Sequence, residues 1–240
     1  MSITTEENIN TWLSHIKEDC KSAISVDCVI FGYDENGLKV LVLECNMPPF
    51  EELPSLVGDL IQKNESLEDA ATRVLFQRTG LRSLYLEQVK TFSKPGRHPL
   101  GRVVSTAFYS LMKIEDYQKN LLEFENVYWH DIDQITDMAF DHKEILEVCL
   151  QRLKRTVKEK PISFQLLPER FTLLQLQSLY EIILGVKLDK RNFRRKLKSL
   201  NVLIEHKESQ TDVSHRPAKL YSFDKALYQE KLERKINFDF

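Results

Sequence analysis

The apolar residues in the first two-thirds of the chain fall in short runs separated by polar turns, which is a pattern typical of strands. The run from Ser25 to Tyr33 is followed by a turn at 34–37 and by a second run from Leu38 to Cys45, so these segments predict a β-hairpin. Three further apolar runs, at 83–92, 102–112 and 126–135, predict later strands.

Two segments in this part of the chain predict helices. Ser66 and Asp69 have the spacing of a helix start, and Gly80 is placed to end the same helix. Between His142 and Lys160, apolar residues recur with a helical period. These apolar residues are Ile145, Leu146, Cys149, Leu150 and Leu153.

The last third of the chain predicts a helix-turn-helix. Thr172 and Gln175 have the spacing of a capping box, and Gly185 is placed to end the helix that they begin. After a short turn, Asp189 is the expected N-cap of a second helix. Two helices joined by a few residues form the helix-turn-helix motif.

The segment after these helices predicts a hairpin with a basic tip. Its apolar runs, at 202–204 and 220–223, are separated by a polar loop. That loop holds Lys207, His215, Arg216 and Lys219. A helix-turn-helix followed by such a hairpin is a winged helix, whose wing contacts the DNA backbone or the minor groove, so Arg216 and Lys219 are candidate DNA contacts.

Projection of the second helix at about 100° per residue separates two faces. Phe193, Leu197 and Leu200 fall on a narrow arc and are expected to pack inward. Asn192, near the helix start, is a candidate partner for adenine, and Arg191 for guanine in the major groove. A solvated basic face is the competing interpretation. The basic residues on the outward arc are Lys190, Arg191, Arg194, Arg195 and Lys198.

The net charge of −2 is divided unevenly along the chain. Residues 1–160 hold 19 Lys and Arg against 26 Asp and Glu, a net −7, whereas residues 161–240 hold 15 against 10, a net +5. Pro161 and Pro168 flank a connector at which the sign of the net charge changes. This suits a boundary between two domains, at residues 1–160 and 161–240. An acidic body joined to a basic domain favours separate duties toward a small ligand and a polyanion.

The segment 59–81 is laid out like a Nudix box, whose pattern is G-x5-E-x7-R-E-U-x-E-E-x-G-U, with U an apolar residue. When the pattern is anchored on its second glycine, the first glutamate and the arginine match it, but the three later carboxylates are missing. The residues at these positions are Glu65, Arg73, Val74, Gln77, Arg78 and Gly80.

The missing carboxylates determine which chemistry the box can support. Magnesium takes oxygen ligands in near-octahedral geometry, and diphosphate hydrolysis needs the metal to neutralise developing charge. Glu68 and Asp69 lie upstream of the empty positions and could not rebuild the cluster unless the helix rotated. The sequence therefore predicts a pocket without a metal site, a catalytic residue or a cofactor, and an ordinary capped helix is the competing interpretation.

The order of strands, box helix, further strands, tryptophan-bearing strand and closing helix resembles Nudix domains over roughly the first two-thirds of the chain. With the segments FTLLQLQSLYEIILG and DKRNFRRKLKSL, the whole chain resembles the Nudix-related transcriptional regulators, especially their sugar-responsive branch, which includes arabinose-responsive repressors. The resemblance implies an α+β fold: a Nudix-like α/β/α sandwich with a mixed sheet, followed by a small winged helix-turn-helix domain. It also implies a homodimer that releases or rearranges on DNA when a small molecule binds the Nudix-like domain.

The substrate cleft of the Nudix fold lies beside the box helix, so the resemblance places an effector pocket near segments 93–104 and 138–144. A sugar needs hydrogen-bonding groups and an apolar or aromatic platform. Arg102 is the first choice among the polar candidates, with an ion pair to Glu87 as its competing role, and each histidine is also a candidate loop cap or surface residue. The candidates are Phe92, Arg97, His98, Arg102, Phe108, Phe140, Asp141 and His142.

Four cysteines without a C-x-x-C pair indicate neither a zinc site nor a disulfide framework, and they fit a reducing cytoplasm. No stretch approaches the roughly 20 apolar residues of a membrane span, and the polar start lacks the regions of a signal peptide. The sequence thus predicts a cytoplasmic, ligand-responsive regulator that represses carbohydrate-utilisation genes, with double-stranded DNA and a sugar or sugar derivative as partners. A Nudix hydrolase acting on a nucleoside diphosphate derivative and a nucleotide-sugar sensor are the alternatives, and carboxylates near the box helix would favour the hydrolase.

Overall fold

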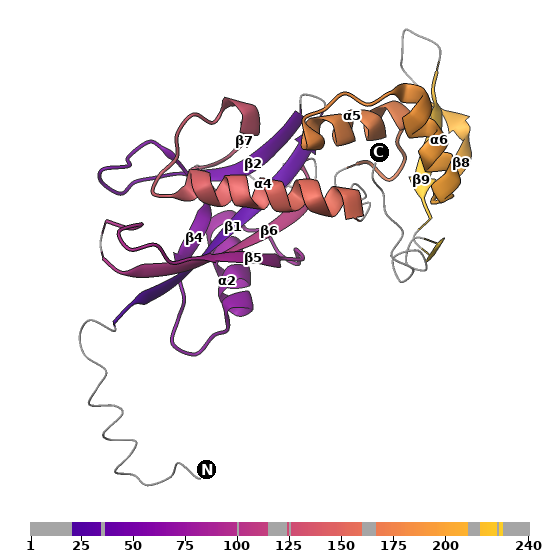
Figure 1. Ribbon diagram of the computed structural model, residues 1–240. Coiled ribbons are helices and arrows are strands. Elements are labelled where there is room, and N and C mark those ends of the chain that lie inside the picture. Colours follow the sequence, from indigo (N-terminus) through magenta and orange to yellow (C-terminus); the bar gives the residue numbers. More distant parts are fainter. Residues whose placement is uncertain are drawn as a thin grey trace, which may run out of the picture.

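The computed structural model describes residues 21–34, 37–99, 101–114, 124, 126–159, 167–210, 217–224 and 226–227. A seven-stranded mixed sheet with helices forms the larger part of the protein. A smaller unit of two helices and a two-stranded hairpin lies at one end of the sheet (Figure 1). The fold is therefore the expected α+β arrangement.

The sheet is centred on its first strand. β1 (Ala23–Asp34) pairs antiparallel with β2 (Gly37–Glu44) and parallel with β6 (Val103–Lys113). The strand order is β3-β2-β1-β6-β5, with β4 also paired to β1 and β7 to β2. The expected hairpin is confirmed, since Asp34 lies opposite Gly37. The other strands are β3 (Pro54–Ser55), β4 (Val57–Leu60), β5 (Glu87–Phe92) and β7 (Val127–Asp131).

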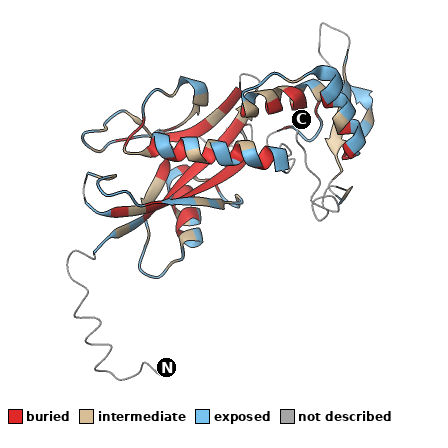
Figure 2. Ribbon diagram, in the orientation of Figure 1, coloured by how far each residue is buried: buried red, intermediate tan, exposed pale blue. Residues whose placement is uncertain are grey.

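Helices α2 (Leu67–Thr79) and α4 (His142–Glu159) cover opposite faces of the sheet (Figure 1). Successive side chains of a strand point to opposite faces, so Phe31 packs in the cluster with α4 whereas Cys28 and Ile30 pack in the cluster with α2. Figure 2 shows burial concentrated on the sheet and on the inner sides of the helices. The α/β/α sandwich is thus confirmed.

The C-terminal unit is the expected winged helix. α5 (Leu173–Leu184) begins with the capping box of Thr172 and ends at Gly185, which has a left-handed φ of 71°. Asp189 caps α6 (Lys190–Leu200) by accepting the N–H of Asn192. β8 (Leu203–Ser209) and β9 (Lys219–Phe223) form the antiparallel wing. The tip at 211–216, with the candidate Arg216, lies outside the described residues.

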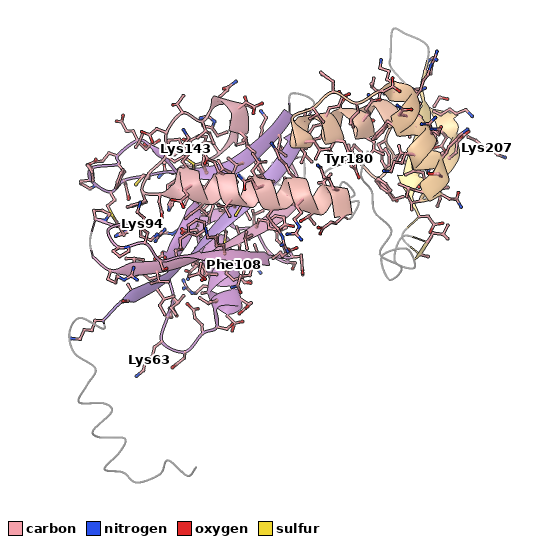
Figure 3. The ribbon with its side chains drawn as sticks, viewed as in Figure 1. Lys63, Lys94, Phe108, Lys143, Tyr180 and Lys207 are labelled. Atoms are coloured by element: carbon pink, nitrogen blue, oxygen red, sulfur yellow. The ribbon has the colours of Figure 1, made fainter. Side chains whose placement is uncertain are left out.

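A continuous apolar contact joins the two parts. Val157 of α4 belongs to the same hydrophobic cluster as Leu179 and Ile183 of α5. Tyr180, labelled on α5 in Figure 3, meets Phe193 of α6 edge to face, with ring centroids 5.8 Å apart. A packed path therefore runs from the sheet through α4 and α5 to α6. The connector at 160–166 lies outside the described residues, so the domain boundary stays a prediction.

Three details of the sheet differ from the pattern-based expectation. The strands expected at 83–92 and 126–135 are shorter, and the second continues as the 3-10 helix η3 (Ile132–Gln134). β3 and β4 were not expected, because Pro54 and Gly58 are poor strand formers whose pairing depends on neighbouring strands. Gly58 is needed there, since an added Cβ would lie 2.2 Å from Oδ1 of Asp27.

Candidate effector pocket and nucleic-acid interface

The residues that match the Nudix box hold the loop before α2 against the helix. Arg73 donates from Nε and Nη2 to the two carboxylate oxygens of Glu65, at 2.9 and 2.6 Å. Arg73 also donates to the carbonyl of Leu60 at 3.0 Å. This hydrogen bonding holds the pKa of Glu65 below its ordinary value. Both matched residues therefore have a structural role, and their side chains already satisfy each other.

The three positions that lack carboxylates do not fit a divalent cation. Val74 is fully buried in the hydrophobic cluster under α2. The amide oxygen of Gln77 accepts a hydrogen bond from Arg73 at 3.0 Å, and Arg78 donates from Nη2 to Asp59 at 2.6 Å. Within the described part of the chain, no group of three or more His, Cys, Asp or Glu side chains is arranged to hold a metal ion.

A pocket of about 400 Å³ lies beside α2, where the Nudix cleft is expected. Two residues of the degenerate box, Gln77 and Arg78, lie in its wall, together with residues of β2 and the loops that follow β2 and precede β7. Its volume lies within the range of small-molecule sites. The polar and aromatic side chains in its wall are Glu44, Asn46, Ser55, Gln77, Arg78, Phe124, Asn126 and Phe140.

Phe140 is the centre of an aromatic cluster at one side of this pocket. Its ring stacks on His98 with centroids 4.8 Å apart and planes 11° apart. The rings of Phe50 and His142 lie 4.7 and 5.1 Å from it. Phe140 has a φ of 55°, a left-handed conformation that is uncommon for a bulky residue. Packing on three sides therefore holds an aromatic wall in place.

A buried polar network lies behind this wall. Arg97 makes a bidentate pair with Asp141, at 2.7 and 2.6 Å, and lies 3.6 Å from Asp27 of β1. The hydroxyl of Ser105 donates to Asp27, and Nε2 of His142 lies 3.5 Å from the same carboxylate. Burial raises the pKa of Asp27, but His142, Ser105 and Arg97 together outweigh burial and lower it.

The backbone fixes the tautomer of His142. Its Nδ1 accepts the N–H of Leu56 at 3.0 Å and must therefore be unprotonated. The ring proton then lies on Nε2, which faces Asp27. The network thus ties the loop before α4 to β1, and His142 is a structural residue in it.

The structure corrects several expected effector contacts. Phe92 and Phe108 are 5% and 1% exposed and belong to the two hydrophobic cores, so neither forms a platform for a ligand. Arg102 is exposed, and it donates to the carbonyl of Ser93. It does not pair with Glu87, whose carboxylate accepts from Arg152.

Only part of the expected effector set lies at the pocket. Phe140 lines it, and the ring of His98 stacks on the ring of Phe140. Arg97, Asp141 and His142 lie in the buried network. Sequence reasoning overlooked the pocket-lining residues Asn46, Phe124 and Asn126. These three residues lie in loops outside the box, so no local pattern in the sequence marked them.

The two faces expected for α6 are confirmed. Phe193, Leu197 and Leu200 are 2%, 5% and 6% exposed, and the basic side chains on the other arc are exposed. The basic residues of this arc are Lys190, Arg191, Arg194, Arg195 and Lys198. Their contact with DNA stays a prediction.

Three candidate DNA contacts already have partners inside the protein. Arg195 donates from Nη2 to the amide oxygen of Asn192 at 2.9 Å, which orients that side chain near the start of α6. Lys219 forms an ion pair with Glu205 across the wing. Lys207, labelled in Figure 3, lies on the wing at the end of the protein opposite Lys63 and Lys94. A wing contact from Lys219 would have to compete with this ion pair.

Two family models match the two parts of the chain. The NUDIX domain matches residues 21–149, and the NrtR DNA-binding winged helix domain matches residues 163–223. The chain is also 32% identical over 227 residues to the ADPR responsive transcriptional repressor NtrR of Acinetobacter baylyi, covering 92% of this chain and 90% of that protein. The chain belongs to the NrtR family. The resemblance to Nudix-related regulators is thereby confirmed, whereas its arabinose-responsive branch is not confirmed.

Solved structures agree with membership of the NrtR family. NrtR of Shewanella oneidensis in complex with a 27mer DNA is 30% identical, with a TM-score of 0.73 over 86% of this chain and 95% of that chain. The Nudix domain of the same protein, in complex with ADP ribose, is 27% identical, with a TM-score of 0.50 over 62% of this chain and 99% of that chain. No helix in the described residues has the length and apolar character needed to cross a membrane.

Proposed function

We propose that this NrtR-type regulator is a transcriptional repressor whose effector is ADP-ribose. The observation that carries the proposal is a Nudix pocket that keeps its walls but has lost its metal-binding carboxylates, joined to a winged helix with an exposed basic face. The relatives support the choice of ligand, since one is named an ADPR responsive repressor and another was solved with ADP ribose. ADP-ribose replaces the carbohydrate effector that the sequence led us to expect.

The pocket contains groups suited to such a ligand. Phe124 and Phe140 offer aromatic surface for a flat base. Asn46, Gln77 and Asn126 offer amide groups for hydroxyls and phosphate oxygens. A free pentose would use only a fraction of a pocket with this mixture of aromatic, amide and cationic groups.

Ligand binding can influence DNA affinity only through a difference in affinity between two states of the protein. The packed path from α4 through α5 to α6 provides a physical route between the two parts of the chain. We propose that ADP-ribose favours an arrangement that binds the operator poorly. We also propose that the protein acts as a homodimer, because paired winged helices match the two halves of a palindromic operator.

The test measures fluorescence anisotropy of the pure protein on labelled operator DNA from its own upstream region, with and without ADP-ribose. We expect ADP-ribose to weaken binding by about 5- to 150-fold, the usual range of coupling between sites. An equimolar mixture of AMP and ribose 5-phosphate is the matched control, and arabinose tests the sugar-responsive alternative. An operator affinity that responds to arabinose and not to ADP-ribose would refute the proposal, and light scattering would report the oligomeric state.

A hydrolase is the less favoured function. The ADP-ribose pyrophosphatase of Methanocaldococcus jannaschii is 28% identical over 125 residues, covering 52% of this chain and 71% of that protein. Because Val74, Gln77 and Arg78 supply no carboxylate, we expect no magnesium-dependent hydrolysis of ADP-ribose above background. Robust metal-dependent release of AMP that Glu65→Gln abolishes would restore the hydrolase interpretation.

A further inference from the structure

The Nudix fold implies a divalent cation at the diphosphate of its ligand, and the residues of this pocket do not fit one. The three box positions that lack carboxylates hold a buried valine, an amide and a guanidinium. A diphosphate diester carries two negative charges, which cost much free energy to desolvate unless they are paired. A pocket that binds such a ligand must therefore obtain positive charge from its own side chains.

Arg78 is the cationic side chain in the wall of this pocket. It lies in the last turn of α2, at a position where the Nudix pattern has a carboxylate. Its side chain is 51% exposed, so the guanidinium is accessible to a ligand. The substitution thus exchanges a metal ligand for a positive charge at one and the same place.

Asp59 orients this guanidinium without using all of its donors. Nη2 of Arg78 donates to Oδ2 of Asp59 at 2.6 Å, and Asp59 lies on β4. Among the described residues, no hydrogen bond occupies Nε or Nη1 of Arg78. A guanidinium has five N–H donors in a planar fork that matches two phosphate oxygens, so one edge remains for a ligand.

We propose that Arg78 binds the diphosphate of the effector in place of the metal ion, so that the ligand is held without a divalent cation. Gln77, Asn46 and Asn126 lie in the same pocket and add neutral donors around the phosphate oxygens. Because guanidinium does not activate water, the same residue gives binding without hydrolysis. The naming of ADP-ribose as the ligand rests on the proposed function, whereas a diphosphate site at Arg78 rests on the pocket itself.

The test is calorimetric titration of the full-length protein with ADP-ribose, ADP and inorganic pyrophosphate, each in EDTA and in magnesium. We expect magnesium to change the affinity for ADP-ribose by less than about twofold, since no group of three or more His, Cys, Asp or Glu side chains in the described part of the chain is arranged to hold the ion. Arg78→Gln should weaken ADP-ribose binding by about 10- to 100-fold, the loss expected for a charged hydrogen-bonded contact. Arg78→Lys should recover part of the affinity because it restores the charge without the fork.

Arg82→Gln is the matched control. Arg82 lies shortly after the same helix, stacked 4.2 Å over the exposed ring of Phe76, and does not line the pocket. Arg82→Gln removes the same charge and should leave the affinity for ADP-ribose within about twofold of the wild-type value. Solvent and salt screen a charge that lies outside the pocket. Both variants should fold, since an exposed ion pair at Arg78 and an exposed cation–π contact at Arg82 each contribute little to stability.

The outcomes separate this inference from the proposed function. Binding of ADP-ribose that requires magnesium, or that Arg78→Gln leaves unchanged, overturns the role of Arg78 while the effector assignment stands. Binding of ADP or pyrophosphate that depends on Arg78, without binding of ADP-ribose, supports the diphosphate site and refutes the effector assignment. Failure of all three ligands to bind in both buffers refutes both.

Discussion

The carboxylate of Glu181, on α5, accepts the backbone N–H of Leu188 at 2.9 Å in the turn before α6. Gln177 closes this contact into a ring, because its Nε2 lies 3.0 Å from both the Leu188 carbonyl and the Glu181 carboxylate. Gln177 is 5% exposed, so its side chain is shielded from water. The turn that sets the direction of the basic helix is thus fixed by side chains of the preceding helix.

Replacing Gln177 with leucine should loosen this turn. The change leaves the partly buried Leu188 carbonyl without its side-chain donor, which should lower the free energy of unfolding by about 1 to 3 kcal/mol in urea denaturation. Operator affinity should fall without a change in salt dependence, because no phosphate contact is removed. Lys187→Ala is the control for stability, since Lys187 is 94% exposed and its ion pair with Glu181 is worth little. If Gln177→Leu kept the stability and operator affinity of the wild type, Gln177 would not fix the turn before α6.

Replacing Asp141 with asparagine should destabilise the Nudix part. The side chain of Arg97 is 4% exposed, and Asp141 is its bidentate partner. Without that carboxylate, the buried guanidinium keeps only Asp27, at 3.6 Å, as a carboxylate partner among the described residues. We expect the free energy of unfolding to fall by about 3 to 5 kcal/mol, toward the lower end of this range because Asp27 stays in place. Arg155→Ala breaks an exposed pair with Glu159 and should cost less than about 0.5 kcal/mol. Chemical denaturation would compare the two, and equal losses would show that the buried pair is unimportant.

The stability contributed by Asp27 should depend on pH in the acid range. Its pKa is lowered in the folded state, so the unfolded chain takes up the proton first, and the contribution is lost as the pH falls through the folded pKa. The difference in stability between wild type and Asp27→Asn should therefore stay constant from pH 7 down to about pH 4 and shrink below it. A difference that shrinks between pH 7 and 5 would show that another group is titrating.

Residues of the basic face of α6 should divide into two kinds. Arg191→Ala or Asn192→Ala should cost about 1 to 3 kcal/mol in operator binding and relax the preference at one or two base pairs. Lys198→Ala, near the end of the helix, should weaken binding to all sequences and lower the salt dependence by about one counterion per monomer. Anisotropy at two salt concentrations would measure both effects. Unchanged affinity in a folded Arg191→Ala and Arg194→Ala double variant would show that another element reads the DNA.

Phe193, on the opposite face of α6, should matter for folding instead. Its side chain is 2% exposed and its ring packs against Tyr180 of α5. Phe193→Ala should destabilise the protein by about 3 to 5 kcal/mol, as is usual when a buried phenyl group is removed. Thermal unfolding monitored by circular dichroism would detect this loss. A stable variant that has lost only DNA binding would mean that Phe193 is not a core residue in solution.

Local rules in the sequence determined most of the helices and the main hairpin. Ser66, Thr172 and Asp189 begin helices, and Gly80 and Gly185 end them, because caps act on backbone groups within a few residues. The periodic apolar residues likewise identified the buried side of α6. The short strands β3 and β4 were not predictable, because their pairing depends on β2 and β1 rather than on their own residues.

At the candidate site, too, some features follow from the sequence alone and others only from the tertiary structure. The sequence by itself determined that the box lacks metal ligands, since fixed spacing on one helix identifies Val74, Gln77 and Arg78. It also determined the basic arc of α6. Only the tertiary structure decided which loop residues reach the pocket and which are buried, as the separation of Phe140 from Phe108 demonstrates. The physical reason is that spacing fixes geometry within one helix, whereas contacts between distant loops depend on how the whole sheet and its helices pack.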